Sequence, residues 1–280
     1  MKFEIGDLVK FTRTTIMSGK DYDTEEIGFI LRRAPRYDWL VKTDNSFELL
    51  NEDKMTLIKK MTNYEKILDK YKIKVNGRYI VEIPDMDSIN LAELFAELGF
   101  SKGVELGVDR GEYSKILCDA NPNLKLYCVD PWISEAYEPN TYVNEPQTYW
   151  NTCYEETKER LKNSNVVLVR KMSADALKDF EDNSLDFVYI DANHDFPNFT
   201  FDLHNWLKKI KEGGIVAGHD YANFSYRKFN HVKRALDAYA RSYRMIPFFV
   251  CGTTNVNTRL KRDHFRSWFW VKHEGGLQNV

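Results

Sequence analysis

From residue 103 onward the chain alternates short apolar runs with longer segments whose apolar residues recur at helical spacing. Apolar runs rich in β-branched and aromatic residues predict buried strands, and apolar residues three and four apart predict helices. The predicted strands are 103–108, 124–130, 165–170, 185–191 and 213–220, and the predicted helices are 111–120, 146–163, 173–180, 199–211 and 230–243. Repeated strand–helix units predict an α/β fold with a doubly wound, Rossmann-like sheet of mostly parallel strands.

Two further apolar runs, 246–252 and 266–273, end this pattern with only a loop segment between them. A parallel crossover usually needs about a dozen residues or more, including a helix, so these runs are predicted to form a hairpin. The sheet is therefore expected to have seven strands, one of them antiparallel.

Residues 1–60 have a different pattern, in which short runs with β-branched or aromatic residues are separated by Gly, Asp, Asn and Pro. This pattern predicts a small antiparallel β domain, a barrel or ribbon of SH3-like size. Helical spacing over 61–73 and 88–99 predicts two helices that lead into the large domain. We therefore expect an accessory domain over 1–60 and a main domain over 61–280.

The composition is that of a soluble globular protein, with 280 residues, 43% hydrophobic residues, 29% charged residues and a formal net charge of −2. Such a charge gives no general attraction to nucleic acid or to membranes. No apolar run approaches about 18 residues, and the first residues lack the apolar core of a signal peptide. The four cysteines are scattered and are expected to stay reduced, as in a cytoplasmic protein.

Glycines and acids stand where the first two predicted strands end. Gly107 and Gly111 are four apart at the turn into a helix, where the backbone must bend tightly or approach a ligand. No Gly-Lys-Ser/Thr follows, which excludes a phosphate-binding P-loop. Asp130 ends the second strand 25 residues after Glu105, and an acid there can accept hydrogen bonds from both ribose hydroxyls. Together these features predict an adenosine-containing ligand.

Other residues at this end of the sheet bear on which ligand it is. Asp109 occupies the middle position of a dinucleotide-type glycine turn, where its carboxylate would repel a pyrophosphate. Asp109 and Glu105 suit an amino-acid ammonium instead, which favours S-adenosylmethionine. Trp132 is placed to stack on adenine, although a core or lid tryptophan fits the sequence equally well. Ser173 and Ala174 follow the third strand, where a doubly wound sheet could present groups to the base.

Four motifs, in order, carry a family resemblance: VELGVDRG (104–111), YCVDPW (127–132), DFVYIDANHDF (186–196) and EGGIVAGHDY (212–221). They resemble the class I S-adenosylmethionine-dependent methyltransferases, and most of all the group that includes macrocin and related sugar O-methyltransferases. The resemblance covers residues 88–272 and leaves 1–60 uncovered. It implies S-adenosylmethionine as the methyl donor and a hydroxyl of a small molecule or glycan as the acceptor.

Acids and histidines end the fourth and fifth predicted strands, at Asp191, His194 and the pair His219-Asp220. These clusters should converge beside the cofactor, with Asp191 among the residues that bind it, because ligands of such sheets bind beyond the carboxyl ends of the strands. Catechol-type and macrocin-type O-methyltransferases hold magnesium with acidic or amide residues at these strand ends. The resemblance thus implies a divalent metal at Asp191, His219 and Asp220. A cation on the acceptor oxygen would lower the hydroxyl pKa, and His194 is placed to take the proton, with Asp191 the other candidate catalytic residue.

His219 departs from the family pattern, in which the related position usually carries an acid. Magnesium prefers oxygen ligands, whereas a histidine suits manganese, iron or zinc. The sequence therefore leaves open whether the metal is Mg²⁺ or Mn²⁺. His219 could instead be a second base or a substrate contact. The carboxylates at the strand ends could simply cap helices, and Asp195 is expected to cap the next helix.

Two other kinds of function stay open at this point. The chain could be a non-catalytic protein that binds an adenosine ligand or acts as a scaffold, or an NAD(P)-dependent oxidoreductase. Segments 133–150 and 221–231, which contain several Tyr and Asn, could form a lid that contacts the acceptor. Assembly into a homo-oligomer is compatible with the sequence.

Overall fold

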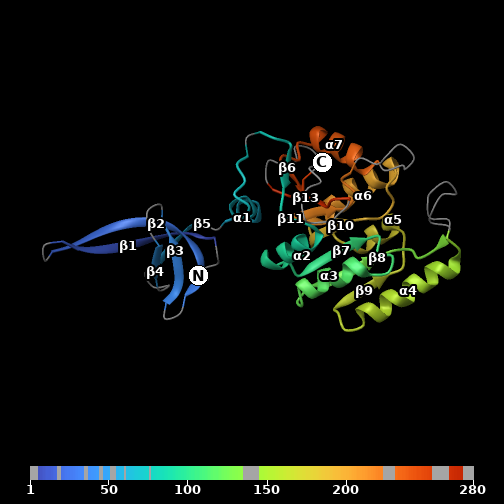
Figure 1. The fold of residues 1–280 in the computed structure, drawn as a ribbon, viewed down its shortest axis with the longest axis horizontal. Helices are drawn as coiled ribbons and strands as arrows, with labels where there is room; N and C mark the ends of the chain where they lie inside the picture. The colour runs from blue at the N-terminus through green and yellow to red at the C-terminus, as the bar shows by residue number, and fades with distance from the viewer. Residues whose placement is uncertain are drawn as a thin grey trace. The chain divides into compact units, whose positions relative to one another are not determined.

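The structure is a computed structural model, which describes residues 6–273 apart from 18–19, 35–36, 44–46, 51–54, 60, 76, 135–144, 223–230 and 254–264. The chain divides into two compact units, Met1–Ile73 and Lys74–Val280 (Figure 1). The boundary predicted from the sequence is 60/61. The later division arises because the segment after residue 60 packs on the first unit, where Met61 and Lys66 lie beside Gly6.

The small unit is an antiparallel sheet with one helix. Its strands follow the order β4-β3-β2-β1-β5 and are β1 (Leu8–Met17), β2 (Lys20–Ala34), β3 (Tyr37–Lys42), β4 (Phe47–Leu50) and β5 (Met55–Lys59). Val9, Ile30 and Trp39 belong to a core of its own. Helix α1 (Asn63–Lys70) begins at a capping box between Thr62 and Glu65. These antiparallel strands agree with the small β domain expected from the sequence.

The large unit is built on one mostly parallel sheet, in the order β6-β12-β13-β11-β10-β7-β8-β9. Only β13 runs antiparallel to its neighbours, which are β11 and β12. The strands are β6 (Ile80–Ile83), β7 (Lys102–Leu106), β8 (Lys125–Val129), β9 (Val166–Val169), β10 (Leu185–Ile190), β11 (Ile210–Gly218), β12 (Phe248–Cys251) and β13 (Trp268–Val271).

Helices cover both faces of this sheet, so its central strands β7 and β10 are mostly buried. Figure 1 shows α2 (Ser88–Glu97), α3 (Glu112–Ala120) and α4 (Gln147–Leu161) as one group and α5 (Ser173–Ala176), α6 (Phe196–Lys209) and α7 (Val232–Ser242) as another. Phe187 of β10 stacks on Phe95 of α2 with ring centroids 4.3 Å apart, while Val188 joins the core that includes residues of α6 and α7. Strands that are buried on both faces have nearly continuous apolar sequences, which is why these strands could be predicted from the sequence.

The sheet has eight strands among the described residues, and the prediction of seven was wrong. The additional strand, β6, lies at the edge and pairs in parallel with β12. Of its four residues only Ile83 is buried, so it lacks the apolar run that identifies a central strand. The predicted antiparallel pairing of the last two strands is confirmed by β12 and β13.

All four cysteines are buried and free of disulfides. None of the helices in the described part of the chain has the length and apolar character needed to cross a bilayer. Strands β7 to β11 run in the same direction, so their carboxyl ends meet along one edge of the sheet. The loops at that edge carry the candidate functional residues.

Candidate active site

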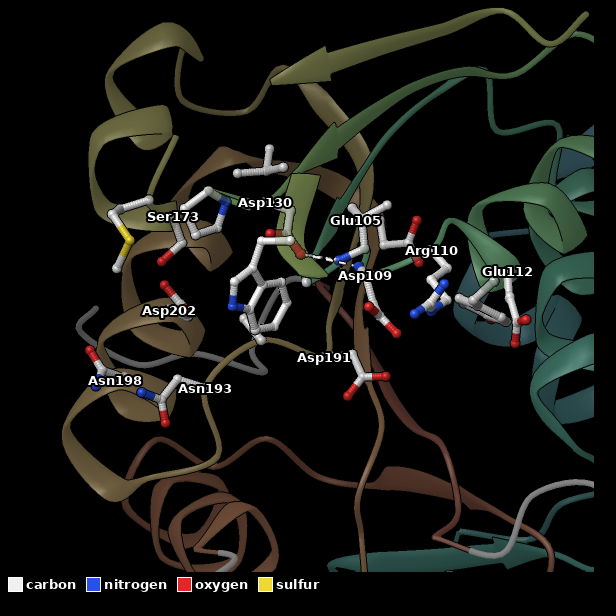
Figure 2. A pocket seen from close by; sticks show the side chains of 18 of the residues that line it. Glu105, Asp109, Arg110, Glu112, Asp130, Ser173, Asp191, Asn193, Asn198 and Asp202 are labelled. Atoms are coloured by element: carbon white, nitrogen blue, oxygen red, sulfur yellow. Dashed lines mark hydrogen bonds between the residues drawn. The ribbon is translucent and has the colours of Figure 1, made fainter. Parts of the chain in front are cut away.

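A cavity of about 570 Å³ lies at the carboxyl ends of β7, β8 and β10 (Figure 2). Its size is typical of a small-molecule site. The residues named from the sequence that line it are Glu105, Gly107, Asp109, Asp130, Ser173 and Asp191. In Figure 2 Arg110 and Glu112 stand on one side of the pocket and Ser173, Asn198 and Asp202 on the other, with Asp109 and Asp130 between them.

Gly107 begins the loop that carries the first motif across the sheet. Its φ is +82°, and a Cβ there would lie 2.1 Å from the carbonyl oxygen of Asp191. The Gly107 amide donates to the Val129 carbonyl at 3.0 Å, which ties the loop to the tip of β8. Only glycine allows the backbone to pass this closely over the tip of β10. The close approach brings the loops after β7 and β10 to one cavity.

Glu105 lies under this loop and is almost fully buried. Its carboxyl group accepts a hydrogen bond from the Ser114 hydroxyl. Burial, with smaller contributions from the charges of Asp191 and Asp130, raises the pKa of Glu105 to about 8. The group is therefore mostly neutral at pH 7 in the ligand-free protein. A cationic group placed beside it would favour the ionised form.

Asp130, at the tip of β8, fixes the shape of the same loop. Its Oδ2 accepts from the amides of Val108 at 2.9 Å and Asp109 at 3.1 Å, and its Oδ1 accepts from the Trp132 amide at 2.8 Å. Burial raises the pKa of Asp130, and the three backbone hydrogen bonds oppose that effect. These bonds hold Asp109 at a φ of +49° and Trp132 at +46°.

The structure puts Trp132 in the core, which is the alternative that the sequence left open beside stacking on adenine. The side chain is fully buried, its Nε1 donates to the Asp109 carbonyl at 2.8 Å, and its ring meets Tyr154 edge to face. The indole that lines the pocket is Trp150 of α4. Gly111 also lies outside the lining; it is the N-cap of α3 and packs against Thr157.

The outer end of the pocket comes from the starts of α5 and α6. Ser173 lines it, whereas Ala174 is exposed on α5 and is not part of the lining. Asn198 and Asp202 of α6 line it too, and the sequence analysis missed both. Asp202 interrupts the apolar face of a helix that buries Phe199, Leu203 and Trp206. An acid in such a stripe was the signal that could have identified it.

The tips of β10 and β11 bring together the predicted acids and histidines. His194 Nε2 lies 3.2 Å from Asp191 Oδ1 and 2.9 Å from Asp220 Oδ2. His219 Nδ1 lies 3.9 Å from Asp191 Oδ2 and 3.8 Å from Asp220 Oδ1. One ligand atom each from Asp191, His219 and Asp220 lie within 4.8 Å of one another. Two carboxylates and two imidazoles thus face a common point at the edge of the sheet.

Burial favours the neutral form of His194, but hydrogen bonds to Asp191 and Asp220 outweigh it and raise the pKa to about 10. The imidazole is therefore charged at neutral pH when these carboxylates have no other cation. Asp195 caps α6, as predicted, because its Oδ1 accepts from the Asn198 amide at 2.8 Å. Most of segment 133–150, and most of 221–231, lie outside the described residues, so their predicted lid role stays a prediction.

Part of the chain is similar to known proteins. A family model described as a methyltransferase domain matches residues 104–221, which contain all four sequence motifs. No match was found among curated proteins. Similar solved structures include an O-methyltransferase from Bacillus cereus in complex with SAH, at 14% identity and a TM-score of 0.47, covering 78% of this chain and 94% of that one.

Two other solved structures are similar at comparably low identity. The O-methyltransferase TomG from Streptomyces achromogenes, in complex with SAM, has 16% identity and a TM-score of 0.47, covering 77% of this chain and 92% of its own. The N-methyltransferase NodS from Bradyrhizobium japonicum has 13% identity and a TM-score of 0.43, covering 66% of this chain and 93% of its own. The family match therefore identifies a methyltransferase domain over residues 104–221 of the large unit.

Proposed function

We propose that the protein is an O-methyltransferase that acts on a hydroxyl of a small molecule or glycan, assisted by a divalent cation at Asp191, His219 and Asp220. The observation that carries the proposal is the convergence of these three side chains at the edge of the sheet, with ligand atoms within 4.8 Å of one another. Asp191 also lines the pocket, so the cation would lie next to the bound methyl donor. A cation there would polarise the acceptor hydroxyl and hold it in line.

The donor set fits a divalent transition metal better than magnesium. Ligand atoms about 2.1 Å from one metal lie about 3 to 4 Å apart, and His219 Nδ1 is 3.9 Å and 3.8 Å from its two carboxylate neighbours. An imidazole with two carboxylates suits Mn²⁺, Fe²⁺ or Zn²⁺, whereas Mg²⁺ prefers oxygen ligands alone. We therefore expect Mn²⁺ to bind more tightly than Mg²⁺.

The methyl donor would be held by the residues around the β7 loop. Glu105 and Asp109 suit its ammonium, because the carboxyl of Glu105 gains charge when a cation comes near. Asp130 has one backbone donor on Oδ1, which leaves a lone pair for a ribose hydroxyl. Ser173 lines the outer end, where the base would lie.

His194 is the proposed base. Transfer forms an oxygen–carbon bond and breaks the carbon–sulfur bond, so the hydroxyl proton needs an acceptor. A proton taken by His194 would lie close to Asp191 and Asp220, which stabilise the charged ring. In the ligand-free protein these carboxylates already keep the ring charged. The base role therefore requires that a cation engage the same carboxylates.

A metal-independent methyltransferase is the second candidate, favoured by one observation. His194 Nε2 already lies within hydrogen-bond range of both carboxylates, so it occupies part of the coordination space. A proton and a metal would compete for those oxygens. The test below separates the two candidates.

The experiment is calorimetric titration of the metal-stripped protein with Mn²⁺, Mg²⁺, S-adenosylmethionine and NADH, in separate runs. The variant is Asp220→Asn, since Asp220 has a φ of +63° and Asn tolerates that conformation. The control is Asp182→Asn, an exposed acid paired with Lys209. We expect methyl-donor binding in all three proteins, no NADH binding, and Mn²⁺ binding lost only in Asp220→Asn.

Labelled S-adenosylmethionine would then be offered with hydroxylated acceptors, and transfer should fall about 100-fold or more in Asp220→Asn. Methyl-donor binding with no metal binding would favour the metal-independent candidate. NADH binding without methyl-donor binding would remove the O-methyltransferase proposal altogether.

A further inference from the structure

An acid that the proposed chemistry does not use lies at the outer end of the pocket. Asp202 of α6 is only 2% exposed and belongs to the pocket lining. Among the described residues its Oδ1 has no hydrogen-bond partner. In Figure 2 the side chains of Asp202 and Ser173, from α6 and α5, point toward one another at the edge of the cavity.

The surroundings of Asp202 favour binding of a hydrogen-bond donor to its carboxylate. Burial, with a smaller contribution from the charge of Asp195, raises the pKa of Asp202 to about 6. A contact with the Ser173 hydroxyl partly opposes this shift. The group is therefore mostly ionised at neutral pH. A buried carboxylate oxygen without a donor is costly, and a ligand N–H that reached it would remove that cost.

The position of Asp202 indicates which part of the ligand would supply the N–H. The ribose is expected at Asp130, on the tip of β8, and β9 is the next strand outward in the sheet. Ser173, just beyond β9, and Asp202 therefore lie on the side toward which a base attached to that ribose extends. Of the common purine edges, adenine carries an N–H donor at position 6, whereas a 6-oxo purine carries an acceptor there.

We infer that Asp202 is the specificity-determining residue of the base subsite, where it accepts a hydrogen bond from the 6-amino group of adenine and repels a 6-oxo purine. Ser173 is the positioning residue that holds the other part of the carboxylate. The inference rests on the binding of S-adenosylmethionine in this pocket. It adds a side chain on α6 that is independent of the metal, the histidine base and the methyl acceptor.

The test compares S-adenosylhomocysteine with S-inosylhomocysteine, which differ at the purine edge, by calorimetric titration of the full-length protein at pH 7.5. The wild type should bind the adenosyl compound about 100-fold more tightly, or better, because a carboxylate would face the 6-oxo group of the other. Asp202→Asn offers an amide donor to that group and should reduce the preference to about tenfold or less. Asp175→Asn, an exposed acid on α5 outside the pocket, is the matched control and should keep the wild-type preference.

The analogue comparison in the wild type needs no substitution, so it stands even if Asp202→Asn is poorly folded. Equal affinities for the two compounds in the wild type would overturn the inference while leaving the methyltransferase assignment intact. A preference retained in a folded Asp202→Asn, checked by circular dichroism, would also overturn it. No binding of S-adenosylhomocysteine would remove both the cofactor assignment and the role of Asp202.

Discussion

The tips of β8 and β10 each carry an aspartate beside the pocket, but the two carboxylates have different surroundings. Asp130 is nearly fully buried and accepts three backbone hydrogen bonds. The Asp191 side chain is 35% exposed and lies beside the side chains of His194 and His219. A carboxylate satisfied by backbone amides fixes the shape of a loop, whereas a partly exposed one beside imidazoles can accept a cation.

Gly107 joins the two regions, and its substitution should have the largest effect. In Gly107→Ala the new Cβ would overlap the Asp191 carbonyl at a positive φ. We expect a loss of about 3 kcal/mol or more in the free energy of unfolding and loss of cofactor binding. The control is Gly99→Ala, with a φ of +75° and open space around it, which should cost about 1 kcal/mol. Urea denaturation measures the stability of each variant, and cofactor titration measures its binding. Equal losses of stability in Gly107→Ala and Gly99→Ala would contradict the close approach of Gly107 to Asp191.

Glu105 should make stability depend on pH in the ligand-free protein. Its pKa of about 8 lies above its ordinary value of 4.5, so the folded state binds more protons between those values. Its contribution to stability is fully present below pH 4.5 and is lost as the pH rises through 8. Relative to Glu105→Gln, the wild type should lose roughly 4 kcal/mol between pH 4.5 and 9. Urea denaturation of both proteins across this range tests it, and parallel pH profiles would be the contrary result.

Asp130→Asn tests whether the β8 aspartate fixes the loop. An amide keeps one acceptor oxygen and turns an N–H₂ group toward backbone donors that Asp130 now satisfies. We expect a loss of about 1–3 kcal/mol in stability and about tenfold or more in cofactor affinity. Asp119→Asn, in an exposed pair with Lys115, should change stability by less than about 0.5 kcal/mol. If both variants behaved alike, the contrast between the two strand tips would fail.

Trp132→Phe should have the smallest effect and bears on the same loop. It removes the Nε1 hydrogen bond to the Asp109 carbonyl and leaves most of the buried ring volume. We expect a loss of about 1 kcal/mol in stability and a change of less than about threefold in the affinity for S-adenosylhomocysteine. A collapse in affinity at unchanged stability would instead support the stacking role that the sequence suggested.

The sequence alone determined the architecture of the large unit and most of its strand-tip residues. Central strands such as β10 are apolar on both faces, and parallel strands bring their carboxyl ends to one edge, so Asp130, Asp191 and Asp220 were identifiable from their positions alone. The short edge strand β6 was missed because its four residues are mostly not buried and its partner is far along the chain.

Only the tertiary structure decided how each side chain is used. Trp132 follows a strand-tip acid in the sequence, yet a backbone φ of +46° and the Asp109 carbonyl direct its ring into the core. Asp202 joined the pocket because α6 packs beside α5, which no local pattern specifies. Periodicity reports which face of an element is buried. Burial and hydrogen bonding depend on segments far apart in the chain, so they appear only when the chain is folded.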